Sequence, residues 1–400
     1  MPKASPANTP LTPIESIRRL IGFDTISSKS NLALIEYVAD YLKSFGIEPT
    51  LVFNDDKTKA NLIAALGPLK PGGIVLSGHT DVVPVEGQNW ETDPFELVEK
   101  DGKLYGRGTS DMKSFIALAL ALVPEFLEKS PKVPIYFAFS YDEEVGCLGA
   151  PFLLERLLKD LPKPLLAVIG EPSGMKVANA HREVRSYTTH IVGRPAHSSI
   201  PACGVNAITH AAKCIAFLED LAGDMRERTG IEEYDPFNPA HTTINVGRIR
   251  GGTATNIVAE HCYVDWDCRS LPQDDPDEAP NRLRAYVEND LLPAMRSAGG
   301  DDGPRIAITT EQRHRAPPLI PKPGSPAEEI VLALSGQNQC ISVPFASEAG
   351  QFQEAGIPAV VCGPGHPAQA HQPNEFIEMS QVDACLAFLR KVGDWAAGQS

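Results

Sequence analysis

The sequence predicts an α/β protein in which a smaller α+β domain is inserted into a larger domain with a mostly parallel sheet. The first observation is length, because 400 residues exceed the size at which one hydrophobic core usually keeps growing. The second is a series of short apolar runs that alternate with helical patterns, which is typical of a parallel sheet covered on both faces. The third is a middle region with a two-residue period, which is typical of half-exposed antiparallel strands.

The larger domain is expected to begin with two amphipathic helices, because apolar residues recur there at spacings of three and four. These helices are expected at residues 14–23 and 32–45. Apolar and β-branched runs then predict four buried strands, at residues 74–77, 134–140, 165–169 and 358–362. Further helices are expected between the strands, at residues 114–127 and 151–158.

The inserted domain shows the alternating pattern of half-exposed strands. Its strands are expected at residues 185–192, 242–247 and 262–269, with an amphipathic helix at residues 205–221. We therefore expect residues 1–183 and 299–400 to form the larger domain and residues 184–298 to form the inserted one.

Composition excludes several classes of protein. Apolar residues make up 42% and charged residues 22% of the chain, which is near the globular average and excludes extensive disorder. The longest apolar run, residues 115–123, is far shorter than the roughly 20 residues of a membrane span. The formal charge of −15 argues against a nucleic acid or an anionic membrane as partner.

The expected compartment is the cytoplasm. The first residues lack the apolar stretch of a secretory signal and the arginine-rich pattern of a transit peptide. Eight cysteines are scattered along the chain without any C-x-x-C pair. This pattern favours reduced thiols over disulfides or a thiolate metal site.

Residues that can bind metals follow each of the four expected buried strands. They are His79 and Asp81, Glu143 and Glu144, Glu171, and His371. Ligands of open α/β sheets bind at the carboxyl ends of the strands, so these segments are expected to converge on one crevice. Another carboxylate, Asp111, stands at the start of an apolar helix, where the helix dipole favours negative charge and Ser110 could serve as the N-cap.

Each of these features alone has an ordinary structural explanation. A single histidine after a strand is more often a loop residue, paired glutamates on a loop are usually solvated, and Asp111 alone could be only a helix cap. Two imidazoles and several carboxylates at strand ends together favour a metal site, because Zn²⁺ takes such nitrogen and oxygen ligands. Co²⁺ or Mn²⁺ could occupy the same ligands.

Six segments carry a resemblance to a known family over nearly the whole chain. In chain order they are SGHTDVVP, GRGTSDMKSFIAL, SYDEEVGCLGA, IGEPSGM, GRPAHSSIP and AHQPNEF. They resemble the zinc metallopeptidase family that includes acetylornithine deacetylase, succinyl-diaminopimelate desuccinylase, aminoacylase and glutamate carboxypeptidase. The resemblance implies a zinc-exopeptidase-like larger domain and a ferredoxin-like inserted domain that serves as lid and dimerisation domain of a homodimer.

The resemblance also implies a set of metal ligands. Asp111 would bridge two zinc ions, with His79 and Glu171 completing one site and Glu144 and His371 the other.

Two further acidic residues receive roles from the resemblance. Asp81 would lie behind His79 and hold its imidazole in the right tautomer and orientation. Glu143 would be a general base that takes a proton from the attacking water and then a general acid that protonates the leaving amine.

Three residues of the inserted domain match the family's substrate-contacting positions. His197 of the partner subunit would reach the reacting carbonyl. Asn256 and Arg269 would bind the substrate carboxylate, and arginine suits a planar, bidentate contact of this kind. The ordinary alternative for all three is a structural polar residue in a sheet or turn.

The reaction implied by the resemblance is hydrolysis of the amide bond of an N-acyl amino acid. Glu171 occupies a ligand position where the family's aminopeptidases tend to have Asp, which favours acylase or carboxypeptidase chemistry. The segments IGEPSGMKVANAHREV and GPGHPAQAHQPNEF favour N-acetyl-L-ornithine as substrate, with ornithine for arginine biosynthesis and acetate as products. The alternatives are N-succinyl-diaminopimelate or another N-acyl amino acid and, from a different class, a non-catalytic dimeric homologue.

Overall fold

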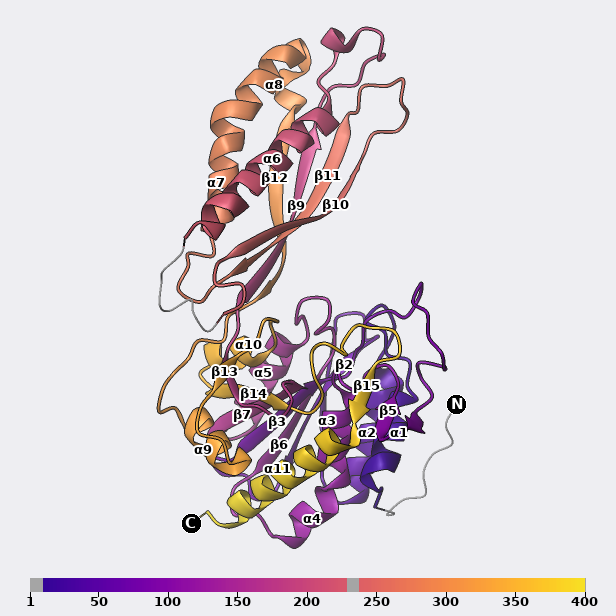
Figure 1. Cartoon of the computed structure of the whole chain (residues 1–400), viewed down its shortest axis with the longest axis vertical. Coiled ribbons are helices and arrows are strands. Elements are labelled where there is room, and N and C mark those ends of the chain that lie inside the picture. Colours follow the sequence, from indigo (N-terminus) through magenta and orange to yellow (C-terminus); the bar gives the residue numbers. More distant parts are fainter. Residues whose placement is uncertain (1–9, 229–236, 400) are drawn as a thin grey trace. The chain divides into compact units, whose positions relative to one another are not determined.

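The computed structural model describes residues 10–228 and 237–399. They form two compact units, each with its own hydrophobic core (Figure 1). Unit 1 contains the described residues up to His181 and from Leu319 onward, and unit 2 contains those from Arg182 to Pro318. Within the described part of the chain, no helix combines the length and the apolar character needed to cross a membrane.

Unit 1 is built on an eight-stranded sheet. Its strands are β1 (Thr50–Phe53), β2 (Ala60–Leu66), β3 (Ile74–His79), β6 (Ile135–Ser140), β7 (Leu166–Pro172), β8 (Ala178–Ala180), β13 (Ile341–Ser342) and β14 (Ala359–Gly363). They lie in the order β1-β2-β6-β3-β7-β14-β8-β13. The central strands β6, β3, β7 and β14 run parallel to their neighbours in this group and are buried along their whole length, which explains their continuous apolar sequences. The predicted mostly parallel sheet is confirmed.

Helices cover both faces of this sheet (Figure 1). They are α1 (Pro13–Ile21), α2 (Leu32–Ser44), α3 (Lys113–Ala121), α4 (Val123–Glu128), α5 (Ala150–Asp160), α9 (Pro326–Ser335), α10 (Ala349–Glu354) and α11 (Met379–Ala397). Residues of α1, α2, α3, α9 and α11 share one core with Leu76 and Val168 of the sheet, whereas α5 and α10 share another with Val75 and Ile169. Successive residues of one strand therefore enter opposite cores.

A sheet of three short strands joins distant parts of unit 1. Its strands are β4 (Val98–Lys100), β5 (Lys103–Tyr105) and β15 (Phe376–Glu378), in the order β15-β5-β4. Phe376 lies opposite Tyr105, and the N–H of Gly106 donates to the carbonyl of Glu375 at 2.9 Å. This pairing holds the segment that follows β5 beside the segment that precedes β15, and each of these segments carries a predicted metal ligand.

Unit 2 has a ferredoxin-like topology. Its elements are β9 (Glu183–Val192), α6 (Ala207–Arg226), β10 (Thr243–Gly251), β11 (His261–Ser270), α7 (Glu278–Tyr286), α8 (Leu292–Gly299) and β12 (Ala307–Ala316). The strands are antiparallel in the order β10-β11-β9-β12, so the chain follows the β-α-β-β-α-β pattern of that fold. Figure 1 shows the three helices on one face of this sheet, where they share a core with Ile191 and Val264.

The chain returns to unit 1 later than we predicted. Unit 1 resumes at Leu319 and not at residue 299. The reason is β12, which pairs with β9 from Ala307 opposite Val192 to Ala316 opposite Val184 and so belongs to the sheet of unit 2.

Candidate metal centre

Three adjacent strands of unit 1 bring four of the predicted site residues together. His79 is the last residue of β3, Glu171 lies near the end of β7, and Glu143 and Glu144 follow β6. Because these strands are parallel neighbours, their carboxyl ends meet at one edge of the sheet. One ligand atom from each of His79, Glu143 and Glu171 lies within 4.8 Å of the other two.

Asp111 lies between two imidazole rings. Its Oδ1 atom is 3.0 Å from Nε2 of His79, and its Oδ2 atom is 3.3 Å from Nε2 of His371. Each ring also faces a second carboxylate, since Nε2 of His79 is 3.6 Å from Oε1 of Glu171 and Nε2 of His371 is 2.9 Å from Oε2 of Glu144. Two imidazole–carboxylate pairs thus share Asp111 between them.

These donors fit a pair of divalent metal ions. Imidazole nitrogen and carboxylate oxygen are ligands that Zn²⁺ takes in proteins. Among the described residues, Oε1 of Glu144 and Oε1 of Glu171 are buried with no hydrogen-bond partner, and a buried carboxylate oxygen is costly unless it is paired or binds a cation. The assignment of the five side chains as metal ligands remains our prediction.

The electrostatics of the cluster also favour a cation. Burial raises the pKa of Glu171 well above its ordinary value and that of Glu144 to about 7. Burial opposes protonation of His79, but the charge of Glu171 and the hydrogen bond to Asp111 outweigh it and hold the His79 pKa well above its ordinary value. Hydrogen bonds to Asp111 and Glu144 raise the pKa of His371 to about 10. Without a cation the cluster therefore retains protons at neutral pH.

Metal binding is accordingly expected to release protons. Ligands must be deprotonated to bind zinc, so near pH 7 titration of the metal-free chain with Zn²⁺ should release about two or more protons per chain, two of them from His79 and His371. Because the raised pKa values favour the protonated ligands, apparent metal affinity should fall as the pH is lowered below 7. Calorimetric titration in buffers with different ionisation enthalpies measures this release, and a heat that is independent of the buffer would contradict it.

Asp81 supports the centre through both its main chain and its side chain. Its carbonyl oxygen lies 2.9 Å from Nδ1 of His79 and can accept a hydrogen bond from that nitrogen. When Nδ1 carries the proton, Nε2 is free to bind a metal. Its carboxylate is farther from that nitrogen, at 3.6 Å, and accepts the backbone N–H groups of Glu143 at 3.1 Å and Glu144 at 3.3 Å. The main chain of Asp81 therefore orients His79, and its carboxylate holds the loop that carries the two glutamates.

Glu375 is a site residue that our sequence-based prediction missed. Its Oε1 atom accepts three backbone N–H groups from residues 108–111, at 2.8 to 3.1 Å, and its Oε2 atom accepts a hydrogen bond from Nη1 of Arg107 at 2.7 Å. Glu375 is buried and follows His371 by four residues. It therefore fixes the loop of Asp111 to the loop of His371. Its place within the AHQPNEF motif is the one sequence signal that could have found it.

The expected capping role of Ser110 is wrong. Helix α3 begins after Met112, and no side chain caps it. The hydroxyl of Ser110 instead donates to the carbonyl of His366 at 3.3 Å and accepts its N–H at 3.2 Å.

Glu143 lies at the edge of the ligand cluster. The thiol of Cys147 donates to its Oε1 atom at 3.4 Å. Burial, with help from the negative charge of Glu144, raises the pKa of Glu143 well above its ordinary value, although His79 opposes the shift. A carboxyl group with such a pKa is suited to exchange protons near neutral pH.

The other three predicted residues lie in unit 2. His197 and Asn256 are on neighbouring loops, since the N–H of Ser198 donates to the carbonyl of Asn256 at 3.0 Å. Arg269 lies at the far end of β11 from these loops and contacts Asp267 at 3.3 Å. All three side chains are exposed, and their roles toward substrate remain predictions.

Comparison with known proteins agrees with this geometry. Residues 75–393 match the model of peptidase family M20/M25/M40. The chain is 34% identical to an acetylornithine deacetylase of Shigella sonnei strain Ss046, over 91% of this chain and 92% of that protein. It is 33% identical to an acetylornithine deacetylase of Pasteurella multocida strain Pm70, over 95% of this chain and 97% of that protein.

The fold is shared with solved structures of the same family. An M20 family metallo-carboxypeptidase from Sulfolobus solfataricus superimposes with a TM-score of 0.75 at 17% identity, covering 97% of this chain and 99% of that one. The family model and the relatives together cover the predicted metal ligands of unit 1 and the whole of unit 2. The chain is therefore a hydrolase that belongs to peptidase family M20/M25/M40.

Proposed function

We propose that the chain is a two-zinc amidohydrolase that removes the acyl group from an N-acyl amino acid, with N-acetyl-L-ornithine as substrate. The observation that carries the proposal is the position of Asp111 between two imidazole–carboxylate pairs, with Glu143 beside them. The choice of substrate is supported by the two acetylornithine deacetylases that match nearly the full chain.

Five side chains would hold the metal ions. His79 and Glu171 would bind one ion, His371 and Glu144 would bind the other, and Asp111 would contact both. When bound, such ions polarise an amide carbonyl and lower the pKa of a water molecule. Three carboxylates do not cancel the charge of two divalent cations, so the centre would stabilise an oxygen on which negative charge develops.

Glu143 would carry the protons of the reaction. As a general base it takes a proton from the attacking water while the new carbon–oxygen bond forms at the acyl carbon. As a general acid it then returns this proton to the amide nitrogen while the carbon–nitrogen bond breaks. The second proton of the water passes to the amine as the new acid ionises, so the products are a carboxylate and an ammonium group. Asp81 holds the backbone N–H of Glu143 at 3.1 Å and so keeps the base beside the cluster.

The substrate is tested by comparing three amides at equal concentration. We expect zinc-loaded protein to hydrolyse N-acetyl-L-ornithine with a kcat/KM at least roughly 100-fold above those for N-acetyl-L-methionine and N-succinyl-LL-diaminopimelate, because a matched polar side-chain pocket rejects the wrong ligand strongly. Release of acetate or succinate is the measurement. A higher kcat/KM with another of the amides would show that N-acetyl-L-ornithine is not the preferred substrate, while the proposed amide hydrolysis would stand. No turnover of any amide would favour a non-catalytic homologue.

We also propose that the chain forms a homodimer through unit 2, so that His197 of the partner subunit completes each active site while Asn256 and Arg269 bind the substrate carboxylate. Strand β10 is an edge strand of its sheet, and unpaired edges are templates for association. Four isoleucines of unit 2 are unusually exposed for their type, namely Ile200, Ile208, Ile249 and Ile257. Where such side chains form one contiguous patch they mark an interaction surface, and the proposal assigns these four to the dimer contact.

The dimer is tested by placing charge on this surface. The double substitution Ile249→Asp and Ile257→Asp should convert a dimer into a monomer, because a buried carboxylate without a partner opposes association. Light scattering coupled to size-exclusion chromatography measures the mass. Leu69→Asp, at an exposed apolar position of unit 1, is the matched control and should leave the dimer intact. A monomeric unmodified chain would refute the proposal.

A further inference from the structure

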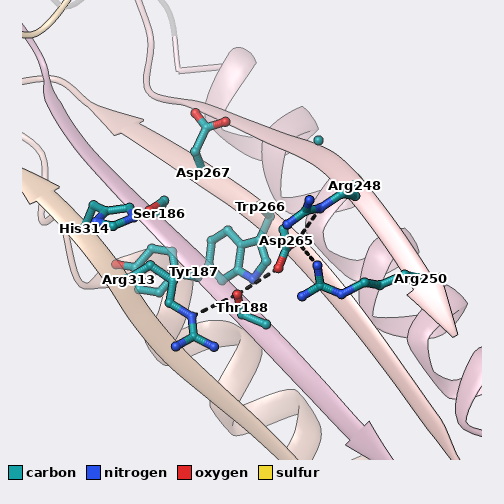
Figure 2. Close-up of a pocket in the computed structure, with 11 residues that line it drawn as sticks. Ser186, Tyr187, Thr188, Arg248, Arg250, Asp265, Trp266, Asp267, Arg313 and His314 are labelled. Atoms are coloured by element: carbon teal, nitrogen blue, oxygen red, sulfur yellow. Dashed lines mark hydrogen bonds and ion pairs between the residues drawn. The ribbon is translucent and has the colours of Figure 1, made fainter. Parts of the chain in front are cut away.

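The sheet of unit 2 has one apolar face and one polar face. Helices α6, α7 and α8 share a core with Tyr187, Val264 and Trp266. Because side chains of a strand alternate between faces, the neighbouring residues Thr188 and Asp265 point to the opposite face, where Thr188 donates a hydrogen bond to Asp265 at 2.8 Å. This second face carries a pocket of about 500 Å³ (Figure 2).

Two β-bulges lie on either side of this pocket. On the edge strand β10 the register shifts between Val246 and Arg248, and Val246 is paired with Trp266. On the other edge strand, β12, it shifts between Gln312 and His314, and Gln312 is paired with Tyr187. Tyr187 and Trp266 are themselves opposite each other on the central strands. Both bulges therefore occur at one level of the sheet, and bulges bend a strand and redirect its side chains.

Basic side chains gather on the pocket from both bulged strands. Nε of Arg248 is 2.8 Å and Nη1 of Arg250 is 3.5 Å from the same oxygen of Asp265. From the other side, Nε of Arg313 donates to the hydroxyl of Thr188 at 3.1 Å. Figure 2 shows this chain of contacts, with Arg248 and Arg250 meeting Asp265 and with Arg313 on the far side of Thr188. One carboxylate and one hydroxyl thus organise three guanidinium groups.

The charge of the pocket is opposite in sign to that of the protein. Three arginines and two aspartates line the pocket, which gives it one excess positive charge. Two neighbouring side chains, Glu311 beside Arg313 and Arg269 beside Asp267, carry opposite charges and leave this excess unchanged. The whole chain has a formal charge of −15. A guanidinium group has five N–H donors, so three of them offer more donors than Asp265, Thr188 and Glu311 can accept. His314 also lines the pocket, and burial and the charge of Arg313 lower its pKa, so its ring is neutral at pH 7 and can donate one N–H.

We propose that this pocket of unit 2 binds a small oxyanion with two or more negative charges, held by Arg248, Arg250, Arg313 and His314. Arginine recognises carboxylates and phosphate-like groups through paired N–H donors. The spread of the three arginines over two strands favours an anion with several acceptor oxygens, such as a tricarboxylate or sulfate, over a single carboxylate. Its lining residues all belong to unit 2, whereas the predicted metal ligands belong to unit 1.

Trp266 gives a local signal for binding. Sulfate and tricarballylate are titrated into the zinc-loaded, full-length chain at constant ionic strength, with acetate as the monovalent comparison. We expect saturable changes in tryptophan fluorescence with a Kd of about 1 mM or tighter for a divalent or trivalent anion. Acetate should give none. The variant Trp266→Phe should lose the fluorescence change, while calorimetry should still detect binding.

Substitutions then decide whether the arginines form the site. In the double variant Arg248→Gln and Arg313→Gln, binding should weaken at least about tenfold, because hydrogen bonds to a charged ligand are lost. Arg305→Gln, at a highly exposed arginine of the same unit, is the matched control and should bind normally. The proposal is overturned if neither anion saturates by about 10 mM. It is also overturned if binding is unchanged in the double variant, which would place the anion elsewhere on the chain.

Discussion

Glu143→Gln is expected to lower kcat by roughly 10²–10⁴-fold, the usual contribution of a general acid–base residue, while leaving the metal content unchanged. The amide of glutamine can occupy the same space but cannot take a proton from water. Glu143 also lies outside the two imidazole–carboxylate pairs that share Asp111. Turnover of N-acetyl-L-ornithine and zinc content by mass spectrometry are measured on the same sample.

A matched control separates this effect from a general one. Glu155 is an exposed glutamate of helix α5, in the same unit. Glu155→Gln makes the same chemical change away from the site and should keep full activity. If Glu143→Gln retained full activity, Glu143 would not be the base. If the Glu143→Gln variant lost zinc, the Glu143 carboxylate would be a metal ligand. This outcome is the alternative because a carboxylate oxygen of Glu143 lies within 4.8 Å of ligand atoms of His79 and Glu171.

Glu375→Gln is expected to weaken metal binding by about 10–100-fold, the usual effect of removing a group that orients a metal ligand. Its carboxylate accepts backbone N–H groups of residues 108–111 and pairs with Arg107. The change also leaves Arg107 buried without its counter-charge, which should lower the free energy of unfolding by about 3–5 kcal/mol. Zinc affinity is measured by competition with a chelator, and stability by chemical denaturation.

Two further variants distinguish loss of metal binding from loss of stability. Glu183 of unit 2 is also buried and pairs with Arg185 at 2.6 Å and Arg315 at 2.7 Å. Glu183→Gln should therefore destabilise the protein but leave its zinc affinity unchanged. Glu375→Asp keeps the charge and should restore part of the affinity. If Glu375→Gln bound zinc as tightly as the unmodified chain, the carboxylate would not position Asp111.

The parts of the fold that were predicted from sequence are those with strong local patterns. β3, β6 and β7 are buried over their whole length, and each begins with an apolar run. Parallel strands meet at one edge, and this rule was enough to expect that the chemically reactive residues after these strands would come together. The structure places ligand atoms of His79, Glu143 and Glu171 within 4.8 Å of one another.

The parts that were missed depend on contacts between distant residues. β4, β5 and β15 have three residues each, too few to show a period, and β15 pairs with a strand more than 250 residues away in the chain. Glu375 acts through this pairing, so its role could not follow from spacing. The boundary of unit 2 was missed because β12 is exposed over most of its length and lacks an alternating apolar pattern.

The most direct test is to locate the metal ions in crystals of the zinc-loaded protein by anomalous scattering at the zinc edge. Two peaks per chain are expected, one beside His79 and Glu171 and one beside His371 and Glu144, both in contact with Asp111. A single peak, or peaks away from Asp111, would contradict the two-metal centre on which the proposed reaction depends.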